Sequence, residues 1–327
     1  MRDVTRTARV LRTLLLAASL SALAFQVQAR PQKDLPYPAP GAKLTPEAII
    51  DQVYFLNHFY GFKNFSIENL GSKSVTVIVN RTEGSSPKTM TVTRHINSDY
   101  NDGKIRQRDI AFFGSGKLKA TGFLITDYED ESKTQSYMIY LPALRKIRRF
   151  AQPAHDDDWG GTVFTFGDVA LRKTEHEDHE LLGEEAFKHC SGFMDIPRNQ
   201  RNRYTRDLPE SEPCEHKGKM VYKVKSTTKF ENWWYDYRIS YVDKETFGDY
   251  RTEYFKDGKM VKFIDRDWGE LSAEFKDPRK LFWKSWYGKD VVTGKETWAY
   301  IPRDVVKYNT DKPSKYWSPR TLTKLKR

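Results

Sequence analysis

Residues 117–150 constrain the fold of this chain most, because they predict three consecutive antiparallel strands. Residues 121–128 are rich in aromatic and β-branched side chains, a polar segment follows, and residues 135–141 begin a second run of the same kind. Pro142 suits the second position of a tight turn, which reverses the chain into a basic third strand over residues 145–150. Three strands joined this closely predict a meander within an antiparallel sheet.

The same stretch contains part of a longer sequence block. Residues 122–124 read Gly-Phe-Leu, and residues 137–149 contain Tyr-Leu-Pro-Ala-Leu-Arg-Lys followed by Ile-Arg-Arg. Near the end of the chain, residues 317–322 read Trp-Ser-Pro-Arg-Thr-Leu. These segments resemble the block and the closing signature of the outer-membrane lipoprotein-sorting proteins, which are relatives of the LolA and LolB lipoprotein carriers. Where that family has a segment of the type Phe-x-Gly-Ser-Asp-Phe, residues 159–169 have a different sequence.

The resemblance implies both a fold and a function. The implied fold is mainly β: a strongly curved antiparallel sheet that forms an incomplete, half-open barrel, with a few short helices as a lid over a hydrophobic cavity. The implied function is that of a carrier that binds lipid or the acyl chain of a lipoprotein, and that works with an inner-membrane exporter of the RND type in trafficking to the outer membrane. The resemblance implies no cofactor.

Residues 1–29 have the pattern of a secretory signal peptide. Four arginines precede an apolar run over residues 14–25, and Val27-Gln28-Ala29 is a small-x-small cleavage site. A membrane anchor is the alternative, but the run is shorter than the ~20 residues that span a bilayer. We therefore predict a soluble periplasmic protein that is not itself lipidated, with an extended proline-rich arm over residues 30–44 and a single β domain of the LolA type over residues 45–327.

The net charge of the full chain is +11, and loss of the four signal arginines and Asp3 would lower it to +8. An exported chain meets little nucleic acid, and anionic lipid headgroups are the commoner polyanion outside the inner membrane. We therefore expect transient contact with an anionic membrane surface and no nucleic-acid partner. A solvated surface without a specific partner is the alternative.

Cys190 and Cys214 are the two cysteines of the chain, and both lie in the part predicted to be exported. An oxidising compartment favours a disulfide between them. The segment that they enclose has no hydrophobic period with which to fold by itself, so covalent closure suits it. On the chain-entropy estimate, closing such a loop contributes about 3 to 4 kcal/mol.

Further segments predict one helix and many strands. Thr45 followed by Pro46 and an acidic residue predicts a helix that begins at Pro46 and continues to about Tyr60. Residues 75–79 and 89–93 flank a turn-rich segment and predict a hairpin. Additional strands are predicted over residues 104–113, 249–255, 260–264, 283–287, 297–301 and 305–308.

The most regular two-residue period in the chain begins at Trp233. From there to residue 242 aromatic and aliphatic side chains alternate with mostly polar ones, which predicts a strand with one aromatic face. A chain with 19 Phe, 18 Tyr and 8 Trp but only 38% hydrophobic residues concentrates its apolar material in rings. This composition favours a curved sheet that encloses a cavity. The candidate lipid-cavity residues are Phe123, Ile125, Tyr137, Ile139, Trp233, Tyr235, Tyr237, Ile239 and Tyr241.

Catalytic and metal-binding signals are weak. His176 and His179 have an H-x-x-H spacing among acidic residues, which we interpret as a solvated charged loop and not as a metal site. The sequence contains no G-x-S-x-G motif and no phosphate-binding glycine loop, and Cys190 beside His189 is better explained as half of a disulfide. We therefore predict a non-enzymatic carrier. A structural or envelope-assembly β protein is the second interpretation, and a periplasmic hydrolase is the third.

Overall fold

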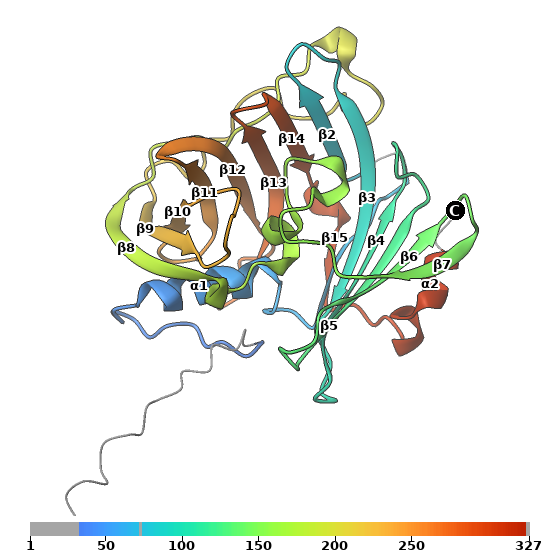
Figure 1. Cartoon of the computed structure of the whole chain (residues 1–327), viewed down its shortest axis with the longest axis horizontal. Coiled ribbons are helices and arrows are strands. Elements are labelled where there is room, and N and C mark those ends of the chain that lie inside the picture. Colours follow the sequence, from blue (N-terminus) through green and yellow to red (C-terminus); the bar gives the residue numbers. More distant parts are fainter. Residues whose placement is uncertain (1–32, 72–73, 325–327) are drawn as a thin grey trace, which may run out of the picture. The chain divides into compact units, whose positions relative to one another are not determined.

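Fifteen strands form one antiparallel sheet in the computed structural model, which describes residues 33–71 and 74–324 (Figure 1). The strand order is β7-β6-β5-β4-β3-β2-β14-β13-β12-β11-β10-β9-β8, and β1 pairs with both β3 and β15. The sheet thus consists of two meanders, β2–β7 and β8–β14, which join where β14 pairs with β2. In the described part of the chain its two end strands, β7 and β8, do not pair with each other, so the sheet is open. The mainly β, unclosed antiparallel fold that we predicted is confirmed.

The elements have the following bounds. The strands are β1 (Asn64–Ile67), β2 (Val77–Thr82), β3 (Lys88–Asn97), β4 (Ile105–Phe113), β5 (Gly122–Tyr128), β6 (Ser136–Leu141), β7 (Lys146–Phe150), β8 (Glu177–Ala186), β9 (Met220–Thr228), β10 (Tyr237–Asp243), β11 (Asp249–Lys256), β12 (Lys259–Glu270), β13 (Leu281–Asp290), β14 (Lys295–Tyr300) and β15 (Val306–Tyr308). The α-helices are α1 (Pro46–Asn57) and α2 (Pro319–Lys324), and short 3-10 or π turns are η1 (Trp159–Gly161), η2 (Gly167–Leu171), η3 (Thr174–His176), η4 (Arg198–Gln200), η5 (Arg303–Val305) and η6 (Ser314–Tyr316).

The predicted meander over residues 117–150 is confirmed as β5, β6 and β7. Phe123 of β5 lies opposite Ile139 of β6 in an antiparallel register. The turn that follows β6 closes with a hydrogen bond of 3.1 Å from the Leu144 amide to the Leu141 carbonyl. A fixed proline φ at the second turn position explains why this reversal could be read from the sequence.

The predicted first helix is also confirmed. Thr45 caps it, because its Oγ1 accepts a hydrogen bond of 3.2 Å from the Ala48 amide. The helix ends at Asn57, three residues before the predicted end. Its buried residues Ile49 and Ile50 belong to an apolar cluster with residues of β9 and β10.

Two predictions about the second half of the chain were wrong in part. The aromatic strand begins at Tyr237 and not at Trp233, and the alternation fails before that point because the neighbours Trp234 and Tyr235 both contact Tyr254. The acidic segment that we interpreted as a solvated loop contains the start of β8, and its Glu177 is only 2% exposed. The strands β8 and β9 had not been predicted.

The strand registers define two faces of the sheet. We define the inner face as the face that carries Ile139 of β6. Ile139 lies opposite Phe123 of β5, and Phe123 lies opposite Ala111 of β4, so all three side chains are on this face. The same face continues in the other meander through Trp286 of β13, which lies opposite Arg266 of β12. The opposite, outer face is covered by α2 over β5 and β6, and by the segment 187–219 over the second meander.

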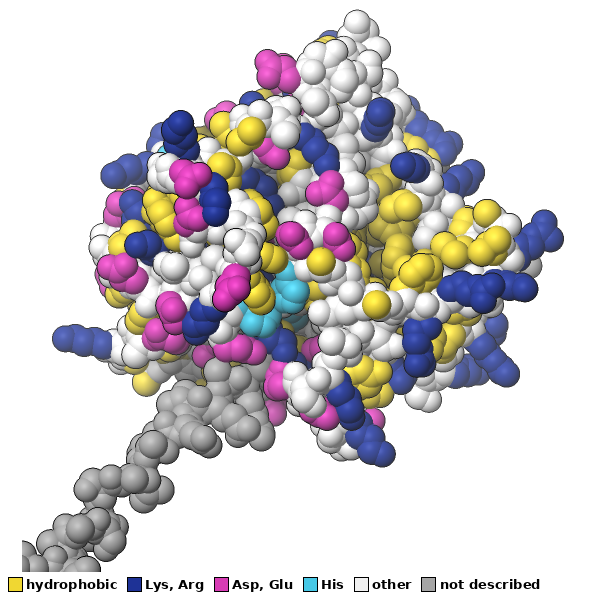
Figure 2. All heavy atoms as spheres, in the orientation of Figure 1, with side chains coloured by type: hydrophobic (Ala, Val, Ile, Leu, Met, Phe, Trp, Pro, Cys, Tyr) yellow, Lys and Arg dark blue, Asp and Glu magenta, His cyan; other side chains and the backbone are white. Residues whose placement is uncertain are grey.

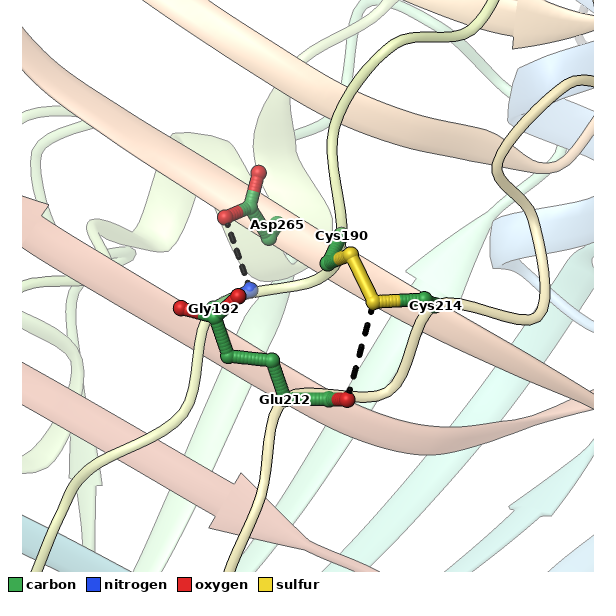
Figure 3. The surroundings of a disulfide bond; sticks show 5 residues. All are labelled: Cys190, Gly192, Glu212, Cys214 and Asp265. Atoms are coloured by element: carbon green, nitrogen blue, oxygen red, sulfur yellow. Dashed lines mark hydrogen bonds between the residues drawn. A yellow bond between two sulfur atoms is a disulfide. The ribbon is translucent and has the colours of Figure 1, made fainter.

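The predicted disulfide between Cys190 and Cys214 is present (Figure 3). It closes a segment that lies on the outer face, where the Gly192 amide donates a hydrogen bond of 3.0 Å to the Asp265 carboxylate (Figure 3). Apolar side chains of this segment pack against β2, β13 and β14, and they include Met194, Ile196 and Leu208. The disulfide therefore fixes a cover over the outer face of the sheet.

The predicted signal peptide lies outside the described residues. No helix in the described part of the chain is both long and apolar enough to cross a membrane.

Candidate ligand-binding face

The structure divides the nine predicted cavity residues among three places. Phe123, Ile125, Tyr137 and Ile139 lie together on the inner face of β5 and β6. Tyr237, Ile239 and Tyr241 lie on the outer face of β10, where Lys225 and Lys223 stack on two of the rings. Trp233 and Tyr235 lie in the turn that precedes β10, and the Tyr235 hydroxyl donates a hydrogen bond to Glu177. Only the first group is therefore placed to line a cavity on the inner face of the first meander.

One half of the inner face is apolar, and we call it the apolar half; it extends over β2–β6, β13 and β14. Phe123 contacts Phe113, and Phe113 contacts Trp159, with ring centroids 5.8 and 5.9 Å apart. Phe123, Ile125 and Ile139 are only partly buried, so apolar side chains remain accessible on this face. Hydrophobic side chains gather over β4–β7 in Figure 2, with Lys and Arg side chains around them.

Polar side chains also lie on the apolar half, among them Gln107, Asp109 and Asp127 of β4 and β5. Arg94 of β3 donates from Nε and Nη2 to the Asp109 carboxylate, at 2.9 and 2.7 Å. Its guanidinium also lies over the Trp283 ring, 5.3 Å from the centroid. Both hydrogen bonds go to Asp109 Oδ2, and the other carboxylate oxygen, Oδ1, is buried without a partner among the described residues.

The other half of the inner face, over β8–β12, is lined by buried charges, and we call it the charged half. Arg238 of β10 donates from Nε and Nη2 to Glu177 of β8, with a shortest distance of 2.6 Å. Arg266 of β12 donates to Asp249 of β11 at 2.6 Å. Lys262 Nζ, also from β12, donates at 2.6 Å to Asp168, which lies outside the sheet.

The electrostatics of this half keep its carboxylates ionised. Burial by itself raises the pKa of Glu177, but Arg238 and Arg172 outweigh burial and lower the pKa to about 2. Asp168 shows the same balance: burial raises its pKa, whereas Lys262 and Arg172 hold the pKa well below its usual range. A general acid or base at neutral pH needs a pKa near the working pH. These two carboxylates are therefore suited to pairing with cations and not to proton transfer.

Residues 159–173 cross the inner face, and we call them the crossing segment. The segment is tied to the second meander by polar contacts: Thr297 Oγ1 accepts from the Val163 amide at 3.0 Å, and the Tyr254 hydroxyl donates to Asp168 at 2.5 Å. Gly288 allows a close approach here, because a Cβ at this position would lie 2.7 Å from both the Val163 and the Phe164 side chains.

The crossing segment meets the strands of the first meander through aromatic contacts, and its end is also paired with the β5–β6 loop, where Lys173 contacts Glu131. Phe166 contacts Tyr137 at a centroid distance of 6.2 Å, and Trp159 contacts Phe113. Buried ion pairs and hydrogen bonds have strict geometry, whereas apolar contacts tolerate sliding. The side of the segment that faces β4 and β6 therefore has fewer directional restraints than the side that faces β11, β12 and β14.

Three small pockets lie along the crossing segment, and Val169 lines all three. The polar pocket, about 60 Å³, is lined by the arginines at 172, 238 and 266. The middle pocket, about 20 Å³, is lined by His58, Arg94 and Ile125 among others. The apolar pocket, about 60 Å³, is lined by residues such as Val92 and Trp286. Ligand pockets commonly measure about 300–1,000 Å³, so an acyl chain would have to widen this row of pockets.

A larger open groove, about 900 Å³, lies elsewhere. Residues 37–44 form one side of it, and β8, β9 and the turn after β10 contribute the other. It shares no lining residue with the three pockets, and its lining mixes Glu184, Lys219 and Lys244 with apolar side chains.

The described histidines do not form a metal site. His179 contacts Ser226 and the Thr174 carbonyl, and His176 lies beside His155 with ring centroids 5.1 Å apart, so the H-x-x-H pair does not converge. In the described residues, the one group of three potential ligands is Cys190, Glu212 and Cys214, whose two sulfurs are already joined.

Comparison with solved structures decides the fold family. A domain classed as an outer membrane lipoprotein-sorting protein from Vibrio parahaemolyticus matches with a TM-score of 0.59 at 13% identity, covering 85% of this chain and 98% of that chain. A DUF1329 family protein from Desulfovibrio piger matches with a TM-score of 0.58 at 17% identity and the same two coverages. This chain has their fold. A LolA superfamily protein from Nitrosomonas europaea shows a weaker similarity, with a TM-score of 0.48 at 13% identity, over 85% of this chain and 100% of that chain.

Comparisons of sequence are less informative than this comparison of structures. A family model described as an uncharacterized protein matches residues 106–208, which include β5–β7 and the crossing segment. No curated protein matches the sequence. The resemblance inferred from residues 122–149 and 317–322 is confirmed at the level of the fold.

Sequence reasoning missed the charged residues of the inner face. Arg238, Lys262 and Arg266 occupy alternate strand positions, but on the sequence they are indistinguishable from the many exposed basic residues of this chain. Arg238 follows Tyr237 and Lys262 precedes Phe263, but Arg266 lies between Asp265 and Asp267, so no common signal in the sequence indicates these three residues. Pairing with Glu177, which is distant in the sequence, could not be inferred without β8.

Proposed function

We propose that this protein is a carrier that binds a lipid, or the acyl chain of a lipoprotein, on the apolar half of its inner face. The observation that carries the proposal is the partly exposed apolar surface of Phe123, Ile125 and Ile139 beside a crossing segment that contacts it through aromatic rings. The fold shared with a lipoprotein-sorting domain supports the same reading.

The energetics suit transfer better than storage. Burying one methylene contributes about 0.8 kcal/mol, so about ten methylenes contribute about 8 kcal/mol, which is comparable with what the same chain gains in a bilayer. Part of this gain is offset by widening the pockets, which measure only about 60, 20 and 60 Å³. Release to an acceptor therefore does not meet a deep free-energy well.

The cellular setting is part of the proposal. We place the protein in the periplasm, exported by the predicted signal at residues 1–29, and working with an inner-membrane exporter of the RND type. The end of the sheet at β7 supports contact with an anionic membrane surface: Arg145, Lys146, Arg148 and Arg149 are exposed there, and Leu144 is 54% exposed. Basic residues near an anionic bilayer each contribute about 1 kcal/mol.

We propose no covalent chemistry. Glu177, Asp168 and Asp249, the carboxylates of the charged half, each accept hydrogen bonds from buried cations, and this leaves them committed to structure. A hydrolase would need polar groups that converge on a substrate in an accessible pocket. The alternative of a purely structural β protein requires that the apolar half stay closed over its own side chains.

The proposal is tested by detergent-free purification of the full chain from a periplasmic extract, followed by native mass spectrometry and by organic extraction of whatever is bound. We expect a copurifying lipid or acylated protein, and after its extraction saturable binding of a fluorescent acyl probe. A protein that is recovered empty, and that binds no acyl probe at concentrations below micelle formation, would support the structural alternative and overturn the carrier proposal.

A further inference from the structure

Two residues that line the apolar pocket carry buried polar groups without a hydrogen-bond partner. The pocket is lined mainly by aromatic and aliphatic side chains, with Arg94 and Thr76 as further members of the lining. Thr76 Oγ1 and Trp286 Nε1 each lack a partner among the described residues. Thr76 is 2% exposed and Trp286 is 5% exposed, so bulk water does not satisfy these groups.

The backbone of Thr76 is held in place although its hydroxyl is free. Its amide donates a hydrogen bond of 2.8 Å to Asn69 Oδ1, and its carbonyl accepts one of 3.2 Å from the Val92 amide. Ile78 follows two residues later in the extended chain, so it shares a face with Thr76, and it also lines the pocket. Thr76 is therefore a fixed part of the inner face.

The indole of Trp286 is held by ring contacts. It packs edge to face against Phe164 and Trp283, with ring centroids 5.4 and 5.0 Å apart, and the Arg266 guanidinium lies 4.1 Å from its centroid. None of these contacts supplies an acceptor for its N–H. Trp286 pairs with Ala299 of β14, which pairs with Ile78 of β2, so Trp286 and Thr76 lie on the same face of the sheet.

The chemistry of the two groups determines what satisfies them. An indole N–H only donates, so its missing partner is an acceptor, and a threonine hydroxyl can donate to the same kind of group. Neither donor is charged, and the charge of Arg94 is matched by Asp109, so a neutral carbonyl oxygen is a sufficient partner. A plain hydrocarbon chain in this pocket would leave both donors unsatisfied, which costs free energy.

Apolar side chains continue from this pocket toward the accessible surface of the apolar half. Ile78 and Val92 line the pocket and belong to one buried cluster with Phe113, against which Phe123 packs. Phe123 lies opposite Ile139, and both are partly exposed. A chain that begins at the pocket can therefore extend past Phe113 and Phe123 toward Ile139.

We propose that the apolar pocket recognises the carbonyl oxygen of an ester-linked or amide-linked acyl chain, with Thr76 and Trp286 as its hydrogen-bond donors. This inference rests on the proposed carrier function, and it specifies that the cargo is an acyl compound and not any apolar chain. An O-acyl lipid and an N-acylated protein both present such an oxygen. The methylenes beyond the carbonyl then lie along Phe113 and Phe123.

The test compares two ligands that differ in the carbonyl group alone. A fluorescent acyl probe is bound to the full chain and displaced by a monoacylglycerol, or by the monoalkylglycerol ether of the same chain length, both below their micelle concentrations. We expect the ester to displace the probe at a concentration about fivefold lower or more, since it offers an acceptor to two buried donors. Equal potency would overturn the carbonyl inference and leave the carrier proposal intact, whereas absence of any probe binding would overturn both.

Thr76→Val removes the hydroxyl with little change in side-chain shape. We expect it to reduce the preference for the ester severalfold without weakening the ether, and without lowering stability in urea, because the hydroxyl has no partner to lose. The matched control is Thr91→Val: Thr91 is buried opposite Val77 on the outer face, and its Oγ1 contacts Ser115 Oγ at 3.2 Å. There we expect an unchanged preference. A preference that persists in Thr76→Val, or that falls equally in both variants, would overturn the assignment.

Two further measurements use the unaltered protein. In isotope-edited infrared spectra, we expect the stretching frequency of a labelled ester carbonyl to be lower in the bound ligand than in an alkane solvent, as two hydrogen bonds require; an unshifted frequency would contradict the proposal. An N-acylethanolamine of the same chain length separates the two sources of the oxygen. The more potent of ester and amide identifies the class of cargo, and if neither exceeds the ether the carbonyl inference fails.

Discussion

The two halves of the inner face belong to one sheet with one alternation of side chains, yet they differ in which side chains are buried. In the charged half, Arg238, Lys262 and Arg266 are each paired with a carboxylate and are at most 6% exposed. In the apolar half, Phe123 and Ile139 stay partly exposed. Buried ion pairs fix the relative positions of the two charged side chains, at a cost in desolvation free energy. An accessible apolar surface, by contrast, is typical of a binding site. The comparison indicates that the charged half holds the crossing segment in place and that the apolar half receives the ligand.

The largest expected effect is on stability and lies in the charged half. Arg238→Met leaves Glu177 buried without its cation, so we expect the free energy of unfolding to fall by about 3–5 kcal/mol. Urea denaturation curves, monitored by tryptophan fluorescence, measure this free energy. Lys225→Met is the control, since Lys225 and Glu180 form an exposed pair with N–O distance 3.8 Å that should contribute less than about 1 kcal/mol. Equal losses in the two variants would contradict the structural role of the charged half.

The border between the halves should be sensitive to acid. Burial lowers the pKa of His58 to about 4, below the ordinary value near 6.5, while the Tyr54 and Ala170 carbonyls lie beside its ring. The unfolded chain therefore binds the proton first as the pH falls, and the contribution of His58 to stability is complete above pH 6.5 and is lost on the way to pH 4. Between pH 7 and pH 5 this loss amounts to about 2 kcal/mol.

His58→Gln removes this titration, so its unfolding free energy should fall less than that of the unaltered protein over the same pH range. Other lowered histidines, such as His95 and His176 with pKa values of about 4, remain and preserve part of the slope in both proteins. Identical slopes for the two proteins would show that His58 is not buried in its neutral form.

The apolar half should control binding. Ile139→Asp places a carboxylate on the inner face at a partly exposed position, so we expect the dissociation constant for a fluorescent acyl probe to rise about tenfold or more. The matched control is Ile239→Asp, which is equally partly buried but lies on the outer face, and there we expect little change. A loss of affinity in the control alone would mean that the outer aromatic face binds the ligand.

The smallest expected effect concerns the two end strands. The strand β7, beside the apolar half, is basic, and β8, beside the charged half, exposes Asp178, Glu180 and Glu184. We expect Arg148→Gln to weaken sedimentation with phosphatidylglycerol vesicles about fivefold, since one basic residue is worth about 1 kcal/mol at an anionic surface. Glu180→Gln should leave binding unchanged, and phosphatidylcholine vesicles should bind neither protein. Equal binding to both lipids would rule out this electrostatic contact.

Local patterns carried the sequence predictions that succeeded. Thr45 with Pro46, and Pro142 in its turn, act through their immediate neighbours, so the helix start and the meander could be read directly. The β8 strand could not, because its acidic residues read as solvent-exposed until Arg238, sixty-one residues away, is seen to pair with Glu177. Long-range strand pairing also explains why the nine predicted cavity residues lie in three different places in the structure.

The alternation of side chains shows which residues of one strand share a face of the sheet. It does not show whether residues of two distant strands lie on the same face. Tyr237 and Ile239 share a face with each other, and Phe123 and Ile139 share a face, yet only the registers through the intervening strands show that the two faces are opposite. The packing of the disulfide-closed segment on the outer face could not be predicted either, because it also depends on contacts between residues that are distant in the sequence.

The location of the acyl chain is the most direct test of this account. A photoreactive fatty acid is bound to the full chain, activated with light, and its attachment sites are mapped by peptide mass spectrometry. We predict that the label lies on β5, β6 and the crossing segment, at or beside Ile125, Ile139 and Val169. Label confined to the segment 187–219 or to the outer face of β10, or a complete lack of specific labelling, would contradict the claim that the apolar half of the inner face binds the ligand.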